Sequence, residues 1–114
     1  MSNARKLNDP SKWGPSFWFT FHMSATAYPN NPASNEKKAM KEFIKTVPLL
    51  IPCSSCQIHS LKYIKSKLYL IDWAVENKMN LFYFWWEFHN HVNKQLGKQE
   101  LSFEKVKDLY QFNN

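Results

Sequence analysis

Two cysteines, Cys53 and Cys56, are the only thiol residues of the 114-residue chain, and they stand two residues apart directly after Pro52. This spacing brings both sulfurs within bonding reach but cannot join distant loops, so the pair suits chemistry or metal binding. At the start of a helix, the positive partial charge of the N-terminus would stabilise a thiolate, the reactive form in dithiol–disulfide exchange. The pair is therefore a candidate redox site.

Three other interpretations of the cysteine pair stay open from the residues alone. The thiols can be buried and inert. A zinc site needs two further ligands, and the spacing of His89 and His91 directs them to different sides of a helix. A thioredoxin-like enzyme requires βαβ units, and the sequence has no strand pattern. These comparisons weaken the zinc and thioredoxin interpretations more than the redox interpretation.

Composition narrows the classes of function. The only glycines are Gly14 and Gly97, which excludes a glycine-rich phosphate loop, so any nucleotide cofactor must be held in another way. Aromatic residues make up 17% of the chain, a surplus that a flat ligand or a partner surface can use. The net charge of +6 favours anionic partners, but Arg5 is the only arginine, which argues against base-specific DNA reading. We expect no nucleic-acid partner.

Membrane and secretion signals are not apparent in the sequence. No stretch approaches the ~20 apolar residues of a membrane helix. The first twelve residues are polar and lack the apolar core of a signal peptide. We expect no membrane span and a reducing compartment, where a Cys-x-x-Cys pair is more often catalytic or metal-binding than structural.

Apolar periodicity predicts an all-α domain over residues 13–114, preceded by a flexible tail over residues 1–12. The expected helices span residues 15–28, 34–47, 52–68 and 80–96, and a short fifth helix follows Ser102. The expected first residues or caps are Ser34 or Asn35, Pro52 and Asn80. The expected apolar face of the third helix is Ile58, Leu61, Ile64 and Leu68. Residues 69–79 are expected to form a short helical turn or a packed loop. The result is a four-helix bundle plus a short fifth helix.

Three short segments, from His89 to Lys98, from Gly14 to His22 and from Pro52 to Cys56, resemble motifs of the Erv/ALR family of FAD-linked sulfhydryl oxidases. His89-Asn90-x-Val92-Asn93-x-x-Leu96-Gly97-Lys98 resembles the family signature His-Asn-x-Val-Asn-x-x-Leu-x-Lys. Gly14, Trp18 and His22 match Gly-x-x-x-Trp-x-x-x-His, and Pro52 to Cys56 match Pro-Cys-x-x-Cys. The order and spacing of the motifs agree over about residues 13–110, nearly the whole predicted domain.

The resemblance implies an FAD cofactor bound at the mouth of the helical bundle. It implies that Cys56 is the sulfur next to the flavin and that Cys53 is the sulfur attacked by the substrate. The cofactor-binding residues that it implies are Gly14, Trp18, His22, His89, Asn90, Val92, Asn93, Lys98 and Tyr110. No metal site is implied.

The resemblance also implies a reaction and its partners. A substrate dithiol opens the Cys53–Cys56 disulfide, FAD takes the electrons, and molecular oxygen is reduced to hydrogen peroxide. Because residues 1–52 and 57–114 contain no cysteine, electrons must come directly from a substrate protein or from a small dithiol carrier. The chain is similar to the short forms of large cytoplasmic DNA viruses, which implies the host cytoplasm or the virion; the mitochondrial intermembrane space is the alternative. A homodimer is expected.

Two rival functions come from other classes. In the first, the chain is a non-enzymatic, basic α-helical binding module with idle cysteines. In the second, it is a small zinc-stabilised adaptor. A yellow protein with thiol-dependent oxygen uptake would separate the oxidase from both rivals.

Overall fold

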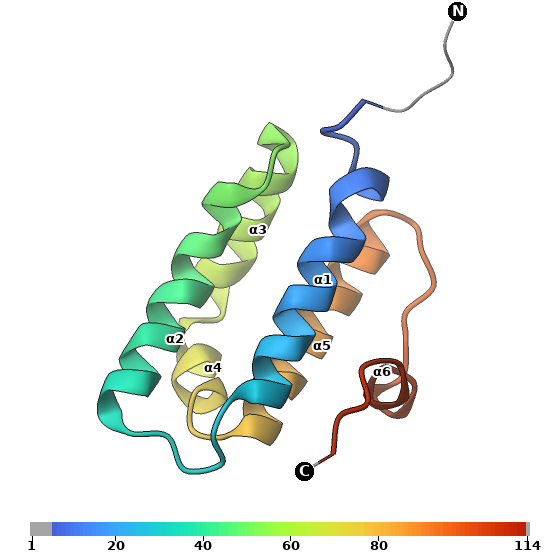
Figure 1. Ribbon diagram of the computed structural model, residues 1–114. Coiled ribbons are helices and arrows are strands. Elements are labelled where there is room, and N and C mark those ends of the chain that lie inside the picture. The colour runs from blue at the N-terminus through green and yellow to red at the C-terminus, as the bar shows by residue number, and fades with distance from the viewer. Residues whose placement is uncertain (1–5, 114) are drawn as a thin grey trace, which may run out of the picture.

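The computed structural model describes residues 6–113, which are helical throughout their regular segments (Figure 1). The elements are α1 (Pro10–Ala27), α2 (Ser34–Thr46), the 3-10 helix η1 (Val47–Leu50), α3 (Ser54–Ser66), α4 (Leu68–Ala74), α5 (Lys78–Gln95) and α6 (Phe103–Leu109). The predicted all-α fold is confirmed. Residues 69–79 were expected to form a short helical turn or a packed loop. They contain most of α4 and the start of α5.

Four of the helices form two packed pairs, and α4 contacts one helix of each pair. Helix α1 packs along α5, and α2 packs along α3, with α4 in contact with both α2 and α5. Figure 1 shows that the first turns of α1 and α3 and the last turns of α5 lie at the same, upper end of the bundle. The three predicted motifs lie on these three helices, so the fold brings together segments that are far apart in the sequence.

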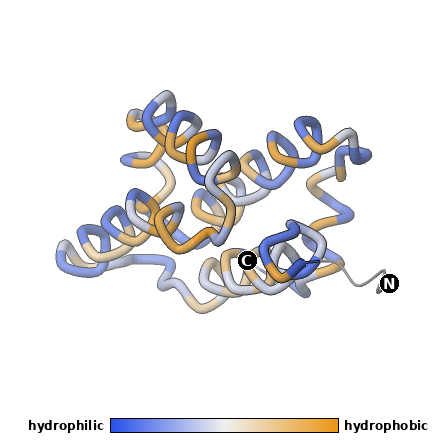
Figure 2. The backbone as a smooth tube through the Cα atoms, turned by 90° about the horizontal axis from the view of Figure 1, so that it is seen from above, coloured by the Kyte–Doolittle hydropathy of each residue, from blue (hydrophilic) through white to orange (hydrophobic). Residues whose placement is uncertain are grey.

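The core is aromatic and lies between α1, α2, α4 and α5. Trp85 stacks on Phe21 with ring centroids 4.5 Å apart, and Ile44 and Ile71 close the same cluster from α2 and α4. Hydrophobic and hydrophilic residues alternate along the helices (Figure 2), as expected for helices that each bury one face. Each large apolar side chain that is fully buried contributes about 1.5–3 kcal/mol to folding.

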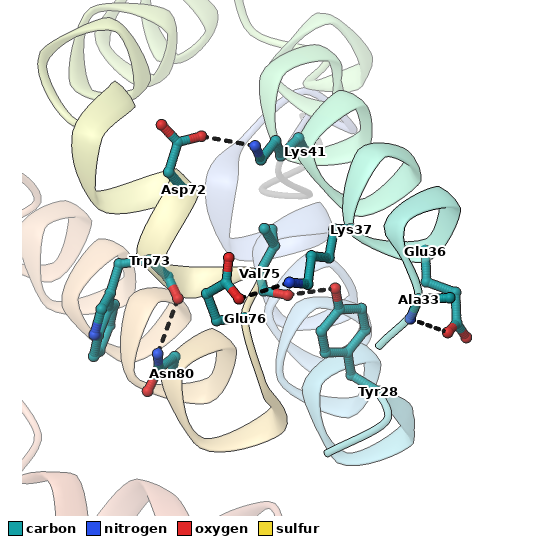
Figure 3. Close-up of polar contacts among 10 residues, drawn as sticks. All are labelled: Tyr28, Ala33, Glu36, Lys37, Lys41, Asp72, Trp73, Val75, Glu76 and Asn80. Carbon is teal, nitrogen blue, oxygen red and sulfur yellow. Dashed lines mark hydrogen bonds and ion pairs between the residues drawn. The ribbon is translucent and has the colours of Figure 1, made fainter. Parts of the chain in front are cut away.

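Polar contacts fix α4 against its neighbours at the lower end of the bundle (Figure 3). Lys37 and Lys41 of α2 pair with Glu76 and Asp72 at 2.7 Å and 2.9 Å. These pairs are largely exposed to water, which screens their attraction, so each adds little to stability. The buried Tyr28 hydroxyl donates to the Val75 carbonyl at 2.7 Å, which ties the end of α1 to the end of α4.

Several helix starts differ from the predicted ones. Helix α1 begins at Pro10, inside the segment expected to be a flexible tail, because Asp9 caps it by accepting a hydrogen bond from the Ser11 amide. Helix α5 begins at Lys78, since its N-cap is Asn77, and Asn80 donates its backbone amide to that side chain. The predicted cap Asn80 was therefore wrong by one turn.

The N-terminus of α2 was also predicted wrongly. Its N-cap is Ala33 rather than Ser34 or Asn35. The Glu36 carboxylate accepts a hydrogen bond from the Ala33 amide at 2.8 Å, so a side chain from within the first turn replaces the missing cap.

The predicted apolar face of α3 is partly wrong. Ile58 is 63% exposed and Leu68 is 48% exposed, whereas Ser60, Tyr63 and Ile64 are buried. The register changes because the chain turns at Lys67, so Leu68 belongs to α4, and because Tyr63 packs edge-on against Phe88 of α5.

No helix within residues 6–113 combines the length and the apolarity needed to cross a membrane.

Candidate active site

Cys53 and Cys56 form a disulfide at the start of α3. Cys53 is the N-cap, so Pro52 precedes the helix instead of occupying its first position as predicted. The Cys53 sulfur accepts a hydrogen bond from the Cys56 backbone amide at 3.3 Å and lies 3.4 Å from the Ser55 hydroxyl. Both cysteines are half-buried. The pair therefore lies at a helix N-terminus, where backbone N–H groups stabilise negative charge on sulfur.

A cavity of about 440 Å³ opens beside the disulfide, between α1, α3, α5 and α6. The predicted site residues that line it are Gly14, Trp18, Cys56, His89, Val92, Asn93, Lys98 and Tyr110. They come from all three motifs and from the C-terminal helix region. The fold thus gathers eight of the eleven predicted site residues around one space.

Flat aromatic rings form one wall of this cavity. Trp18 of α1 stacks on His89 of α5, with centroids 4.1 Å apart and ring planes inclined by 8°. Phe88 meets the Trp18 ring edge-on at 5.4 Å. The parallel pair of Trp18 and His89 gives this wall a flat surface that suits a conjugated ligand.

The end of α5 supplies the polar part of the cavity. Gly97 adopts the left-handed conformation with φ of 71°, which ends the helix and turns the chain back. The Lys98 amide then donates to the Asn93 carbonyl at 2.8 Å. Burial, with a smaller contribution from the Lys98 charge, lowers the pKa of His89 to about 4. An anionic ligand group next to His89 and Lys98 would thus meet a neutral donor or acceptor and a cation.

Three predicted site residues do not line the cavity, and Cys53 is one of them. Only Cys56 of the disulfide faces the cavity. Cys53 is half-buried on the other side of the bond, where an incoming thiolate could reach it.

Asn90 is the second residue outside the cavity. Its side chain donates to the Leu101 carbonyl at 2.6 Å and accepts from the Leu101 amide at 2.8 Å. Asn90 therefore fixes the segment that follows Gly97 instead of facing the cavity, and the indole of Trp86 donates to the same carbonyl at 2.7 Å.

His22 is the third residue outside the cavity. It is completely buried behind His89, with its Nε2 atom 3.0 Å from His89 Nδ1. Its ring stacks on Tyr110 at 4.2 Å. Burial, with a smaller contribution from His89, lowers the pKa of His22 to about 3.

Sequence reasoning missed several residues of the cavity wall. Two of them, His59 and Ser60, lie one helical turn after Cys56. The other two are Trp13 and Phe17, which directly precede the predicted residues Gly14 and Trp18 in α1. Helical spacing from Cys56 could have indicated the first two, because residues three and four apart share a face.

Residues 6–113 contain no group of three or more His, Cys, Asp or Glu side chains arranged to hold a metal ion. The zinc interpretation therefore has no ligand set in the part of the chain that the structure describes.

Comparison with known proteins connects this site to one family. The profile of the Erv1/Alr family matches residues 15–111. A protein of Invertebrate iridescent virus 6, provisionally named FAD-linked sulfhydryl oxidase 347L, is 41% identical over 108 residues, which cover 91% of this chain and 96% of that protein. The FAD-linked sulfhydryl oxidase of African swine fever virus is 33% identical over 100 residues, which cover 87% of this chain and 80% of that protein.

A solved structure gives the same result for the fold. The FAD-binding domain of Erv1 from Saccharomyces cerevisiae matches with a TM-score of 0.81 and 29% identity, over 90% of this chain and 94% of that chain. The family profile covers all three motifs except Gly14, and the cavity joins their residues to the disulfide. The chain belongs to the Erv1/Alr family.

Proposed function

We propose that this protein is an FAD-dependent sulfhydryl oxidase, which forms disulfide bonds by taking two electrons from protein dithiols. Its relatives carry that activity in their names. The observation that carries the proposal is the Cys53–Cys56 disulfide, because only its inner sulfur, Cys56, lines a cavity of cofactor size. A disulfide with one sulfur toward a cofactor and the other toward solvent can pass electrons from a substrate to that cofactor.

The residues of the cavity fit FAD. Sites for small molecules and cofactors usually measure ~300–1,000 Å³, and this cavity of about 440 Å³ lies within that range. Trp18 and His89 offer flat rings, and Lys98 offers a cation for a pyrophosphate. Asn93 and Val92 complete the wall from α5. When bound, FAD supplies the acceptor for the two electrons of a dithiol and can deliver them to molecular oxygen, which becomes hydrogen peroxide.

Thiol–disulfide exchange at Cys53 begins the reaction. A substrate thiolate attacks the Cys53 sulfur, the Cys53–Cys56 bond breaks, and Cys56 leaves as a thiolate. The second substrate thiol loses its proton and attacks the substrate sulfur of the mixed disulfide, which releases oxidised substrate and the Cys53 thiolate. The reduced pair then gives up two electrons to re-form its disulfide, with Cys56 as the sulfur at the cavity.

The helix start stabilises both leaving sulfurs. The Cys56 amide already donates to the Cys53 sulfur at 3.3 Å, and Cys56 lies within the first turn of α3. Because unpaired N–H groups and the helix dipole stabilise anions there, each thiolate is a better leaving group than it would be in the middle of a helix.

An absorption spectrum and an oxygen electrode test the proposal. Purified protein should be yellow and should consume oxygen when a dithiol such as dithiothreitol is added. The Cys56→Ser variant should retain flavin and lose turnover, and Cys53→Ser should do the same. Ser54→Ala is the matched control, because Ser54 is an exposed residue of the same turn outside the disulfide. A colourless protein, or full turnover without Cys56, would refute the proposed function.

We also propose that the protein acts as a homodimer. Phe19 of α1 is 58% exposed, and removing its apolar surface from water against a second copy would be favourable. Light scattering should give twice the mass of the chain, and a mass equal to one chain at micromolar concentration would contradict the dimer.

For the place of action, we propose the host cytoplasm or the virion of a large DNA virus. Viral proteins are among the relatives that match most of the chain, although a mitochondrial yeast relative also matches. A tagged copy expressed in animal cells should stay in the cytosol, and import into mitochondria would favour the intermembrane space instead.

A further inference from the structure

His22 is a buried polar residue that the proposed reaction does not use. It is completely buried and is absent from the cavity wall. Its ring is held between neighbours: it stacks on Tyr110 at 4.2 Å and lies 5.2 Å from the Phe82 ring. A side chain that carries two polar atoms into such surroundings costs stability unless its hydrogen bonds repay the burial.

One hydrogen bond joins His22 to the cavity wall. The Nε2 atom of His22 lies 3.0 Å from Nδ1 of His89. Two neutral imidazoles can share this contact in only two ways, because one nitrogen must carry the proton and the other must accept it. Burial lowers the pKa of both rings, to about 3 for His22 and to about 4 for His89, so both are neutral near pH 7.

The other nitrogen of His22 distinguishes the two arrangements. His22 Nδ1 is sealed from solvent and has no hydrogen-bond partner. If His89 donated to His22, the second proton of the pair would sit on this atom as a buried N–H without an acceptor. If His22 donates, Nδ1 carries only a lone pair. Orphaned buried N–H groups are rarer than under-satisfied acceptors, so His22 is the donor.

This assignment determines what His89 presents to the cavity. With Nδ1 accepting from His22, the single proton of the neutral His89 ring must sit on Nε2. That atom is not sealed like His22 Nδ1, and His89 lines the cavity. We propose that His22 is a positioning residue that holds His89 in its Nε2–H form, so that His89 donates a hydrogen bond to an acceptor atom of bound FAD. The inference rests on the proposed function for the identity of the ligand.

Nitrogen NMR of the flavin-loaded protein tests the tautomers directly. In ¹⁵N-histidine-labelled protein near pH 7, long-range proton–nitrogen spectra should show a protonated Nε2 and an unprotonated Nδ1 for both His22 and His89. A protonated Nδ1 on His89 would overturn the proposal, even if the protein is yellow and oxidises thiols. If instead the protein binds no flavin but shows the expected tautomers, the proposed function fails and the tautomer assignment stands.

Two substitutions separate the hydrogen bond from simple packing. His22→Leu fills the space without a donor, and it should weaken FAD binding about tenfold, the effect of one buried hydrogen bond. His22→Gln places an amide near the position of Nε2 and should restore most of the affinity. Equal affinities for the two variants would overturn the proposal. If His22→Leu does not fold, the wild-type spectra and the affinity of His22→Gln still decide it: a tenfold loss in His22→Gln would count against the hydrogen bond.

Discussion

The indole of Trp18 lies face to face with the imidazole of His89, with centroids 4.1 Å apart and planes inclined by 8°. One ring comes from α1 and the other from α5, so the stack joins two of the sequence motifs across the bundle. Because both rings also line the cavity, the same contact that holds the helices together shapes the binding surface. Changes at Trp18 should therefore affect stability and cofactor binding together.

Trp18→Ala should lower both properties. The free energy of unfolding should fall by about 1–3 kcal/mol, below the 3–5 kcal/mol of a fully buried tryptophan because Trp18 is half-buried. FAD affinity should fall at least tenfold, since His89 loses the ring that fixes its plane. Thermal unfolding and flavin titration measure the two effects. Trp18→Phe keeps an aromatic face and should retain most of the affinity; equal losses in both variants would argue against a role for stacking.

Periodicity in the sequence predicted the interior of α5 better than its ends, whereas in α3 it placed the exposed Ile58 on the buried face. In α5, helical spacing predicts one apolar stripe of Leu81, Phe84, Trp85, Phe88, Val92 and Leu96. The first four are buried, Val92 is half-buried, and Leu96, which caps the end of the helix, is 46% exposed. The start of α5 was harder, because Asn77 and Asn80 are both good caps and only the tertiary position of the preceding turn selects Asn77.

In the site, too, local spacing predicted some features, and others depend on tertiary packing. The motif spacings predicted which segments meet, but three of the predicted site residues do not face the cavity. His22 and Asn90 match the motif positions, yet His22 is covered by Tyr110 and Asn90 bonds Leu101. Both partners lie in the C-terminal segment, whose position depends on long-range packing that no local pattern records.

Acid should destabilise the protein through its buried histidines. Burial lowers the pKa of His22 and His89 from 6.5 to about 3 and about 4. Between pH 6.5 and pH 4, the unfolded chain therefore binds more protons than the folded chain, and the free energy of unfolding falls as the pH falls. This stability is fully present above pH 6.5 and is lost progressively below it. Urea unfolding at pH 7.5, 6.5 and 5.5 measures the slope, in a range where most carboxyl groups stay ionised.

Replacing single histidines shows which of them causes the pH dependence of the unfolding free energy. His22→Gln cannot take up a proton, so its stability should fall less steeply between pH 6.5 and pH 5.5 than that of the wild type. His91→Gln is the matched control, because His91 lies on the same helix as His89 but is an exposed residue. The remaining burial of its ring and the charge of Lys67 also lower the pKa of His91. A wild-type slope in His22→Gln would contradict the role of the buried ring.

Asn90→Ala should disturb the cavity from outside it. The variant removes both hydrogen bonds to Leu101, at 2.6 Å and 2.8 Å, and should lower the free energy of unfolding by about 1–3 kcal/mol. Because the released segment includes Lys98, FAD affinity should also fall. Tyr28→Phe is the control, since it removes a buried hydrogen bond to Val75 on the other side of the core. It should lower stability but leave the affinity unchanged; a loss of affinity in both variants would mean that lower stability alone weakens binding.

The two glycines should respond differently to replacement by alanine, because Gly97 has a positive φ and Gly14 is helical. Gly97 has a φ of 71° and no atom within 4 Å of an added Cβ, so Gly97→Ala is opposed by backbone conformation alone. It should lower the free energy of unfolding by about 1–2 kcal/mol, and Gly97→Asn should lose less because asparagine tolerates this region.

Gly14 lies inside α1 and lines the cavity, and an added Cβ would also meet no atom within 4 Å. Alanine favours a helix over glycine by about 0.5–1 kcal/mol, but the ring of Pro15, the next residue in α1, disfavours helical geometry for a preceding residue that carries a Cβ. Because these two effects oppose each other, Gly14→Ala should change the unfolding free energy of protein stripped of flavin only slightly. The same methyl group enters the space that we assign to FAD, so affinity for FAD should fall several-fold. Urea unfolding of stripped protein and flavin titration measure the stability and the affinity separately. A variant that binds FAD as tightly as the wild type would place the cofactor away from this turn of α1.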